Sequence, residues 1–474
     1  MTVPKAFRHI AVLDIGKTNA KVVVLDAATG DEIAAVRTSN AVSRSGLYPH
    51  YGIARLWTFA IGALKSFATE PGFDAISITA HGAAAVLLDV GDNLALPALD
   101  YEHHYPDAVN QAYDRLRPSF DETFSPRLSG GLNLGAQLHY QKTVFPERFA
   151  DVATIMTYPQ YWAWRLTGIA SNEVTSLGCH TDLWNPRTGE YSALIDKLEL
   201  RKLMAPLRSA FDALGPVLPS VAAAIGIEAD VPVYCGIHDS NASLLPHLIG
   251  REPPFSVVST GTWVVSFAVG GDLDHLDPER DALANVDAFG RAVPSSRFMG
   301  GREFEILKSE IGDVTLEDAQ SAVWTVIEKG FMLLPSVVSG SGPFSSREMR
   351  WIASESTNPA ERMAAVSLYL ALMTDVCLGL IGAKGPILVE GPFALNKIYT
   401  AALSTLTSSQ VIALPGSTGT SLGAALLTGS SPSLHSAKYA KIELPDLKSY
   451  REAWHRALND HSPTEKSVGH AGGS

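Results

Sequence analysis

Cysteine is scarce in this sequence. Cys179, Cys235 and Cys377 are the only cysteines among 474 residues, they lie far apart, and no C-x-x-C spacing occurs. A disulfide framework or a thiolate zinc site requires several cysteines at short and regular spacings. The sequence therefore predicts three small buried side chains and neither kind of site.

Charge and long apolar runs are scarce as well. Only 18% of the residues are charged, the formal net charge is −12, and the lysines and arginines are scattered along the chain. A protein of this charge does not attract nucleic acid or anionic lipid unless it carries a local basic patch. No apolar run approaches the roughly 20 residues of a membrane span, and the residues after Met1 lack the apolar stretch of a signal peptide. We therefore expect a cytoplasmic globular protein whose partners include neither nucleic acid nor a membrane.

Two common nucleotide-binding motifs are also missing. The sequence contains no G-x-x-x-x-G-K-[ST] run, and no G-x-G-x-x-G follows the first apolar segment. The first motif holds phosphates in P-loop proteins, and the second holds the pyrophosphate of dinucleotides. P-loop kinases and dinucleotide-dependent enzymes are therefore disfavoured.

The most informative feature of the sequence is a turn that occurs twice. Residues 9–26 contain two apolar β-type runs joined by a turn of small and polar residues, and residues 255–267 repeat this arrangement. Backbone N–H groups in such a turn have no strand partner and form a concave site for anions. Two hairpins of this kind that face each other would hold a polyphosphate.

Elsewhere, strand and helix patterns alternate, which is typical of an α/β fold. Helix stop signals and β-rich apolar runs set the limits of each element. The expected elements are a helix over 54–69, a strand over 74–79, a long helical region over 129–165 that stops at Gly168, a helix over 359–382, and strands over 387–390 and 411–414.

A composition break at residues 250–254 marks the expected boundary between two domains. We predict one domain over residues 1–248, a second over 249–460 and a disordered tail over 461–474.

Six motifs follow one another between about residues 9 and 430. They are Asp14-x-Gly16-x-Thr18-Asn19-x-Lys21, His81-Gly82, Tyr161-x-x-x-Arg165-Leu166-Thr167-Gly168, Gly236-x-His238-Asp239, Ser259-Thr260-Gly261-Thr262-Trp263 and Gly423-Ala-Ala425. Together they resemble the FGGY family of carbohydrate kinases, whose fold is similar to that of actin, hexokinase and the heat-shock chaperone ATPases. The resemblance implies an α/β protein of two actin/hexokinase-like (ribonuclease H-like) domains with a catalytic cleft between them. Domain 1–248 would bind the sugar, and domain 249–460, closed by the helix at Gly423–Ala425, would bind the nucleotide.

By this resemblance, the protein is a kinase that transfers phosphate from ATP, with Mg²⁺, to a terminal hydroxyl of a small sugar. The His238-Asp239 pair is most similar to rhamnulokinases, and the general sugar-loop pattern is similar to fuculokinases and xylulokinases, so a ketose is the expected substrate. Many relatives are dimers, which makes a homodimer possible. Two alternatives remain open: an inactive sensor of sugar or nucleotide with the same fold, and another ATPase of the superfamily, such as an acid kinase.

Asp239 is the expected general base. It lies where a strand gives way to a helix, and ligands bind at that edge of an open α/β sheet. The resemblance implies that this carboxylate takes the proton of the accepting hydroxyl. The alternative is an ordinary helix N-cap, a position that aspartate favours.

Asp14 ends the first apolar run and is the expected magnesium ligand, with water between the carboxylate and the ion. Its alternative role is to start the turn and cap its own backbone. The turn that follows would donate hydrogen bonds from its backbone and hydroxyl groups to the phosphates of ATP, and its lysines would add positive charge. The alternative for Lys17 is an ordinary solvated lysine in a turn. These expected ATP ligands are Gly16, Lys17, Thr18, Asn19 and Lys21.

The second hairpin supplies further expected ATP ligands from the other domain. Thr260, Gly261 and Thr262 would hold the outer phosphates, because glycine allows a close backbone approach. Gly300, Gly391 and Asn396 resemble nucleotide-contacting positions in later loops.

The expected sugar-binding residues are His81, Gly82, Tyr101 and His238, with Asp239 beside them. A histidine in such a loop donates or accepts a hydrogen bond without a full charge. The pair His103-His104 does not predict a metal site, because adjacent side chains point in different directions.

Three positions depart from the family pattern. Lys17 stands where the family more often has threonine, and residues 101–104, Tyr-Glu-His-His, replace a tryptophan followed by an Asp-Arg pair. Residues 390–393, Glu-Gly-Pro-Phe, replace the usual triple-glycine adenine loop.

Overall fold

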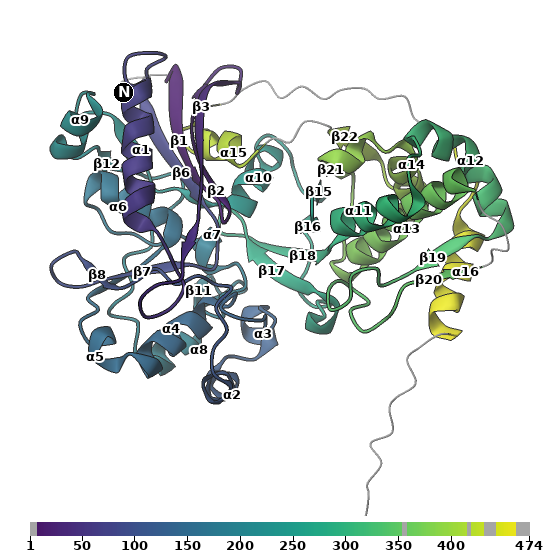
Figure 1. The fold of residues 1–474 in the computed structure, drawn as a ribbon, viewed down its shortest axis with the longest axis horizontal. Coiled ribbons are helices and arrows are strands. Elements are labelled where there is room, and N and C mark those ends of the chain that lie inside the picture. Colours follow the sequence, from purple (N-terminus) through teal and green to yellow (C-terminus); the bar gives the residue numbers. More distant parts are fainter. Residues whose placement is uncertain (1–6, 353–357, 415–418, 431–441, 461–474) are drawn as a thin grey trace, which may run out of the picture. The chain divides into compact units, whose positions relative to one another are not determined.

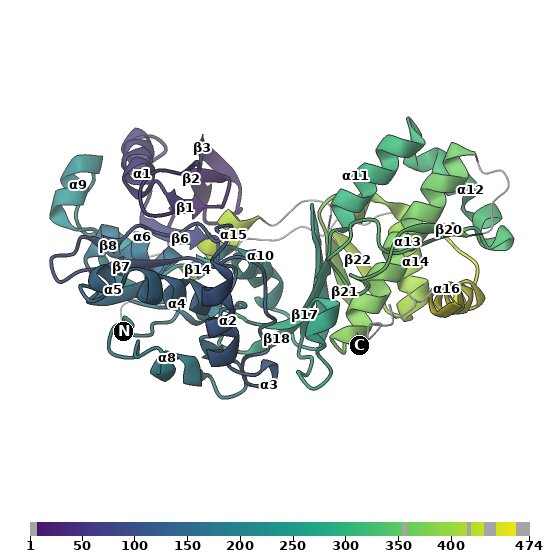
Figure 2. The same cartoon turned by 60° about the horizontal axis from the view of Figure 1, so that its bottom comes forward.

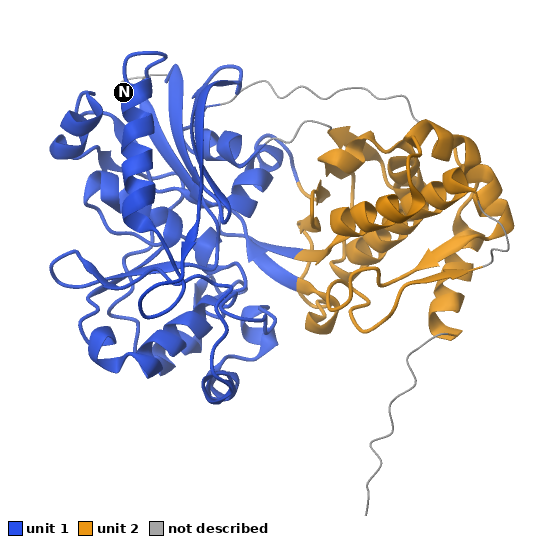
Figure 3. Ribbon diagram, viewed as in Figure 1, with its two compact units in different colours: residues 1–252, 283–294, 418–435 blue, residues 253–282, 295–417, 436–474 orange. Residues whose placement is uncertain are grey.

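The computed structural model describes residues 7–352, 358–414, 419–430 and 442–460. The chain forms two compact units (Figure 3). The predicted tail, residues 461–474, lies outside the described residues. Unit 1 comprises residues 1–252, 283–294 and 418–435, and unit 2 comprises residues 253–282, 295–417 and 436–474.

Unit 1 is built on a sheet with the strand order β12-β13-β6-β1-β2-β3, in which β14 also pairs with β6. Strands β1 and β2 form the predicted antiparallel hairpin, and both β1 and β14 run parallel to β6. The carboxyl ends of these three parallel strands therefore lie at one edge of the sheet. The strands of this sheet are β1 (His9–Ile15), β2 (Asn19–Asp26), β3 (Glu32–Ser39), β6 (Ala75–Ala80), β12 (Ala213–Pro216), β13 (Pro232–Tyr234) and β14 (Ile237–His238).

Helices and three small sheets complete unit 1. Helix α1 packs its apolar face, including Leu56 and Ala60, against the sheet, and Figures 1 and 2 show it beside β1 and β2. The smaller sheets are β4-β5, β10-β11 and β8-β7-β9. Their strands are β4 (Val42–Ser43), β5 (His50–Tyr51), β7 (Ala85–Leu88), β8 (Leu94–Leu96), β9 (Thr154–Thr157), β10 (Trp184–Asn185) and β11 (Glu190–Tyr191). The helices are α1 (Ile53–Phe67), α2 (Asp107–Leu116), α3 (Phe120–Thr123), α4 (Leu134–Val144), α5 (Pro146–Phe149), α6 (Tyr158–Thr167), α7 (Val174–Leu177), α8 (Ala193–Lys197), α9 (Pro219–Ile225), α10 (Asp239–Leu248) and α15 (Thr420–Leu426).

The long helical region predicted over residues 129–165 is wrong. Strand β9 interrupts it and pairs with β7, because Thr154-Ile-Met-Thr157 is a short run suited to a strand. Proline at the first turns of α5 and α6 starts new helices on either side of β9. The predicted stop is confirmed, since Gly168 caps α6 with a φ of 74°.

Unit 2 contains a sheet with the order β17-β18-β16-β15-β21-β22 and a small sheet β19-β20. Strands β15 and β16 form the second predicted hairpin, and β15, β21 and β22 run parallel. Parts of β17 and β18 are residues that cluster with unit 1. The strands are β15 (Phe255–Thr260), β16 (Val264–Val269), β17 (Ala282–Val286), β18 (Ala292–Phe298), β19 (Met332–Leu334), β20 (Arg350–Ile352), β21 (Ile387–Glu390) and β22 (Val411–Leu414).

Helix α13 is the centre of the core of unit 2, where it packs with α12, α14 and the sheet. It spans 22 residues, and its most apolar 18-residue stretch has a mean hydropathy of 1.8, so by length and composition it could cross a membrane. The expectation that no apolar run approaches a membrane span is therefore wrong for this segment. Of its most apolar stretch, 83% is buried inside unit 2, which is typical of a core helix. The helices of unit 2 are α11 (Gly300–Ile311), α12 (Leu316–Lys329), α13 (Pro359–Leu380), α14 (Lys397–Thr407) and α16 (Lys448–Asp460), with 3₁₀ turns at Pro278–Arg280 and Pro392–Leu395.

The motif at Gly423–Ala425 implied a helix that closes the nucleotide domain. In the structure this helix, α15, groups with unit 1 instead. Ser77 of β6 donates a hydrogen bond to the carbonyl of Ala424 at 2.6 Å. A Cβ atom at Gly423 would lie 1.7 Å from the carbonyl oxygen of Ala242 in α10. Glycine at this position therefore permits the close packing of α15 on α10.

Candidate functional site

Three strand ends of unit 1 bring the predicted chemical groups together. Ile15 of β1 and His238 of β14 both lie opposite Ala80 of β6 in the parallel register. Asp14 is therefore the next-to-last residue of one strand, His81 follows the second, and Asp239 follows the third. Ligands of open α/β sheets bind at the carboxyl ends of parallel strands, so this edge is the candidate site.

Asp239 is the first residue of α10, and the N-cap position belongs to His238. The Asp239 carboxylate accepts a hydrogen bond from the backbone N–H of Ser240 at 2.7 Å, and its Oδ1 lies 3.1 Å from His238 Nε2. Burial alone would raise the pKa of Asp239, but the hydrogen bond and charge of His238 outweigh it and hold that pKa below the ordinary value. The carboxylate is therefore ionised at neutral pH and ready to accept a proton.

Buried hydrogen bonds to Thr175 and Glu173 hold the backbone of this turn in place. The hydroxyl of Thr175 accepts a hydrogen bond from the backbone N–H of His238 at 3.1 Å and donates one to Glu173 Oε2 at 2.5 Å. Burial raises the pKa of Glu173 to about 7, against the opposing effect of the hydrogen bonds from Thr175. Sequence analysis missed both residues, because their position below His238 depends on tertiary packing.

The three cysteines are buried, as predicted. Burial raises the pKa values of Cys235 and Cys377 to about 12. Burial has the same tendency at Cys179, but the neighbouring His180 and His238 outweigh it and lower the pKa to about 5. Burial would lower the pKa of the His238 imidazole, but the neighbouring Cys179 and Asp239 outweigh it and raise that pKa well above the ordinary value.

Gly82 lies against the His238 imidazole, and His81 directly precedes it in the chain. His81 is 4% exposed, its Nδ1 lies 2.8 Å from the carbonyl oxygen of Gly82, and its Nε2 is buried without a hydrogen-bond partner among the described residues. Burial lowers the pKa of His81 to about 4, so the ring is neutral. A Cβ atom at Gly82 would lie 2.6 Å from His238 Nε2, which leaves no space for a side chain. His81 Nε2 is therefore a group that a bound ligand would satisfy.

Tyr101, another predicted sugar ligand, is close to this group. The ring centroids of His81 and Tyr101 are 5.8 Å apart, and those of His81 and Tyr51 are 4.8 Å apart. The structure therefore brings together all four of the residues predicted for the sugar, together with Asp239.

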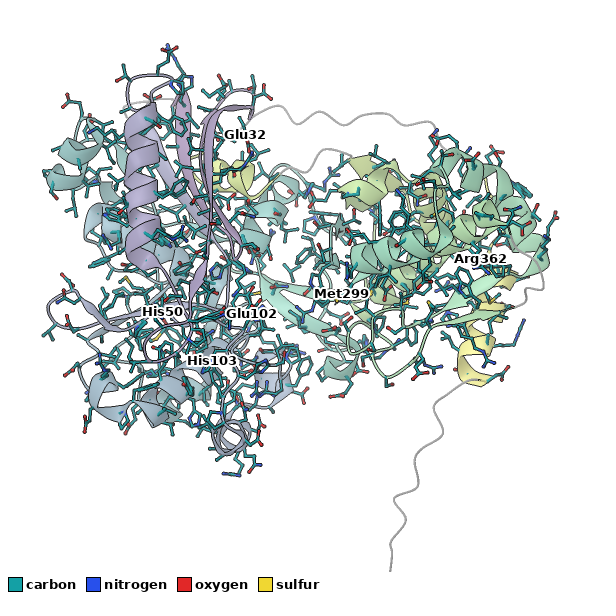
Figure 4. The ribbon with its side chains drawn as sticks, in the orientation of Figure 1. Glu32, His50, Glu102, His103, Met299 and Arg362 are labelled. Carbon is teal, nitrogen blue, oxygen red and sulfur yellow. The ribbon has the colours of Figure 1, made fainter. Side chains whose placement is uncertain are left out.

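Lys17 and Lys21, predicted as phosphate ligands, have carboxylate partners in the structure. The Lys17 ammonium forms an ion pair with Asp100, and its Nζ lies 3.6 Å from Glu102 Oε2. The Lys21 ammonium pairs with Glu32 at 2.6 Å. Figure 4 labels Glu32 and Glu102 in separate parts of unit 1, so the two lysines have separate surroundings.

The rest of the first turn is held by Asn40. Its side chain donates to the carbonyl of Gly16 at 2.8 Å, and its backbone N–H donates to the carbonyl of Thr18 at 2.7 Å. Asn19 begins β2 directly after the turn. These two hydrogen bonds fix the backbone conformation of the turn that is predicted to bind phosphate.

Asp14 accepts hydrogen bonds on a single oxygen, Oδ2, from Thr420 at 2.5 Å and Ser421 at 2.8 Å. Burial raises the pKa of Asp14, and these two bonds oppose that change. No hydrogen bond within the described ranges falls on Oδ1, which leaves a hard oxygen for a cation. Magnesium in phosphate-transfer sites takes one or two carboxylates and completes its shell with water and phosphate oxygens, so this residue fits the ion.

The predicted nucleotide residues of unit 2 form a group of their own. Arg302 N–H, in the first turn of α11, donates to the carbonyl of Thr262 at 3.2 Å, and a Cβ atom at Gly301 would lie 1.9 Å from the carbonyl of Gly261. Figure 4 labels Met299, the residue before α11. Thr260 donates its hydroxyl to the carbonyl of Glu390 at 2.5 Å. The second turn thus contacts both the Gly300 and the Gly391 loops.

Asn396 has a structural task in unit 2. It caps α14 by accepting a hydrogen bond from the N–H of Tyr399 at 3.1 Å, and its amide donates to Ser367 at 2.9 Å. It is 3% exposed, so its role in nucleotide binding stays a prediction.

Comparisons with known proteins agree with this arrangement. A carbohydrate kinase from Novosphingobium aromaticivorans is 35% identical, and its solved structure matches 94% of this chain and 100% of that chain with a TM-score of 0.87. The L-xylulose/3-keto-L-gulonate kinase of Escherichia coli (strain K12) is 25% identical over 299 residues, which are 59% of this chain and 58% of that relative. The L-fuculokinase of Salmonella typhi is 24% identical over 278 residues, or 56% of this chain and 57% of that relative. The matches to both curated relatives thus span less than two thirds of their lengths.

Family models match both halves of the chain. The N-terminal domain of the FGGY family of carbohydrate kinases matches residues 9–246, and the C-terminal domain of carbohydrate kinase FGGY matches residues 252–437. The family, the α/β class and the two-domain, actin/hexokinase-like fold predicted from the motifs are confirmed. The chain belongs to the FGGY family of carbohydrate kinases.

Proposed function

We propose that this protein is an ATP-dependent kinase of a terminal hydroxyl of a small ketose. One observation carries the proposal: an ionised carboxylate, Asp239, and a buried imidazole nitrogen, His81 Nε2, share one edge of the sheet in unit 1, and that nitrogen has no hydrogen-bond partner in the described part of the chain. The names of the relatives, an L-xylulose/3-keto-L-gulonate kinase and an L-fuculokinase, support a keto sugar as the acceptor.

In this proposal, Asp239 accepts the proton of the sugar hydroxyl as the hydroxyl oxygen bonds to the γ-phosphorus of ATP. The bond from that phosphorus to the β-phosphate oxygen breaks, ADP leaves, and the proton passes from Asp239 to water. His81 Nε2 and His238 orient the sugar. Asp14 would hold Mg²⁺ through its free oxygen, and the ion supplies charge neutralisation to the phosphate oxygens.

The nucleotide ligands are proposed from both units. In unit 1 they are the turn residues after Asp14, and in unit 2 they are the turn of the second hairpin and the loops that contact it. We also propose a cytoplasmic location, where ATP is abundant, and a possible homodimer. The proposed ligands are Gly16, Lys17, Thr18, Asn19, Lys21, Thr260, Gly261, Thr262, Gly300, Gly391 and Asn396.

A coupled assay of ADP release with ATP and Mg²⁺ tests the function. The panel contains rhamnulose, fuculose, xylulose, ribulose and erythrulose, and we expect sugar-dependent ADP release with at least one of them. Measurable sugar binding without ADP release from any sugar would instead support the inactive sensor. ADP release with a carboxylate acceptor alone would support an acid kinase.

The pair His238–Asp239 predicts a pH effect. A general base works only when deprotonated, so activity is lost as pH falls through its pKa. Because His238 holds the pKa of Asp239 below the ordinary value, the acidic limb of kcat/KM should lie below the range of a free carboxyl group. Replacing His238 with glutamine removes the positive charge, and we expect the acidic limb to move to higher pH.

The measurement is the pH profile of kcat/KM for the wild type and His238→Gln. His247→Gln, in the last turn of α10, is the matched control and should leave the acidic limb of the profile unchanged. An unchanged limb in His238→Gln would show that His238 does not tune the base.

A further inference from the structure

Lys17 and Asp100 form a partly buried ion pair in unit 1. Asp100 is 4% exposed, and its Oδ1 also accepts hydrogen bonds from the hydroxyl of Tyr51 and the backbone N–H of Glu102, both at 3.3 Å. The Lys17 ammonium lies 4.5 Å from the ring centroid of Tyr101 and 5.2 Å from that of Tyr51. An ammonium held by one carboxylate and two aromatic faces has a defined position.

The pair lies beside the proposed sugar site. The two tyrosines that contact Lys17, Tyr51 and Tyr101, also contact the His81 ring, as does Tyr158. Burial raises the pKa of Tyr101, and so do the nearby charges of Glu102 and Asp239. The Lys17 side chain is 20% exposed, so a ligand beside His81 can still reach it.

The charges of this group sum to a negative value. Lys17 contributes one positive charge, whereas Asp100 and Glu102 contribute two negative charges. The ionised Asp239 adds another negative charge, which His238 offsets when protonated. A carboxylate on the substrate would therefore meet repulsion here, whereas the hydroxyl groups of a neutral sugar would find both an acceptor and a donor.

We propose that Lys17 and Asp100 are specificity residues that bind hydroxyl groups of a neutral ketose and reject sugar acids. This inference rests on the proposed function and changes the task of Lys17 from a phosphate ligand to a sugar ligand. The carboxylate of Asp100 accepts from a sugar hydroxyl, and the ammonium of Lys17 donates to a sugar oxygen.

The first test compares Lys17→Met with wild type in the KM for L-xylulose and the KM for ATP. Hydrogen bonds to charged groups are worth about 1.5–3 kcal/mol, so we expect the sugar KM to rise by at least about tenfold and the ATP KM to change less than about twofold. Lys65→Met, on the exposed face of α1, is the matched control. A raised ATP KM with an unchanged sugar KM would return Lys17 to the phosphates and overturn the inference.

The second test uses Asp100→Asn, which leaves Lys17 with less negative charge around it. We expect the preference for L-xylulose over D-gluconate, measured as a ratio of kcat/KM values, to fall by at least about tenfold, because the repulsion of a carboxylate is removed. Asp196→Asn, which alters an exposed ion pair with Arg201, is the control. An unchanged ratio would overturn the inference while ADP release by the wild type still supports the kinase.

Two additions keep the test decisive. The double variant Lys17→Met/Asp100→Asn buries no unpaired charge, and it should lose affinity for L-xylulose without gaining affinity for D-gluconate. Calorimetric binding of both sugars gives the same ratio without turnover. A wild type that binds L-xylulose and releases ADP with none of the panel ketoses would refute the kinase, and the binding ratios would still decide the role of the pair.

Discussion

Replacing Asp239 with asparagine is expected to lower kcat by at least about a hundredfold, the ordinary contribution of a general base. The amide has the size of the carboxylate, and its oxygen still accepts the N–H of Ser240. It does not accept the proton of an attacking hydroxyl. The measurement is ADP release at saturating ATP and sugar.

Binding separates this chemical role from a structural one. Because His238 outweighs burial and lowers the pKa of Asp239, the folded protein favours the charged carboxylate, and the neutral amide should lower stability modestly. We expect the dissociation constants of sugar and nucleotide to stay within about threefold of wild type, because the loss is one of chemistry and not of ground-state binding. Asp196→Asn is again the control. Turnover at the wild-type rate in Asp239→Asn would end the assignment.

The sequence was sufficient to predict this site where the signal was local. An apolar run, a turn of small residues and a second apolar run specify each hairpin. Asp14, His81 and Asp239 each follow such a run, and parallel pairing with β6 brings their strand ends to one edge. Their proximity follows from strand order, which the family pattern supplied.

The contacts that sequence analysis missed join residues far apart in the chain. Asp100 is 83 residues from Lys17, and Thr175 is 63 residues from His238. Ser421 lies 407 residues from Asp14, and its motif was interpreted as part of the other domain. No local sequence pattern shows that the lysine of the predicted phosphate-binding turn, Lys17, pairs with a distant carboxylate. The one sequence signal nearby was that residues 101–104, directly after Asp100, depart from the family pattern.

Helix α13 shows the converse difficulty. Its apolar composition satisfies the criteria for a membrane span, and only its packing inside unit 2 shows why all of its faces are apolar. A helix that is apolar on every side is buried either in lipid or in a large core. Composition alone does not separate the two.

Replacing Gly391 with alanine is expected to destabilise unit 2 by about 2–6 kcal/mol. Gly391 has φ 82° and ψ −164°, a conformation that only glycine adopts readily, at a cost of about 1–3 kcal/mol for other residues. A Cβ atom there would also lie 2.0 Å from the carbonyl oxygen of Thr260. Relief of that overlap breaks the hydrogen bonds from Thr260 to Glu390 and from Phe393 to Thr260, at about 0.5–1.5 kcal/mol each.

Gly312 provides the matched control for this prediction. It has nearly the same backbone conformation, φ 92° and ψ −166°, but a Cβ atom there meets nothing within 4 Å. Gly312→Ala therefore measures the backbone strain alone, which should be about 1–3 kcal/mol. The free energy of unfolding of each variant is measured by denaturant titration, with binding of a fluorescent ATP analogue as the report on unit 2. The difference between the two free energies isolates the overlap with Thr260. Equal losses in both variants would show that β15 and the Gly391 loop are not in close contact, and the proposed nucleotide site of unit 2 would lose its main support.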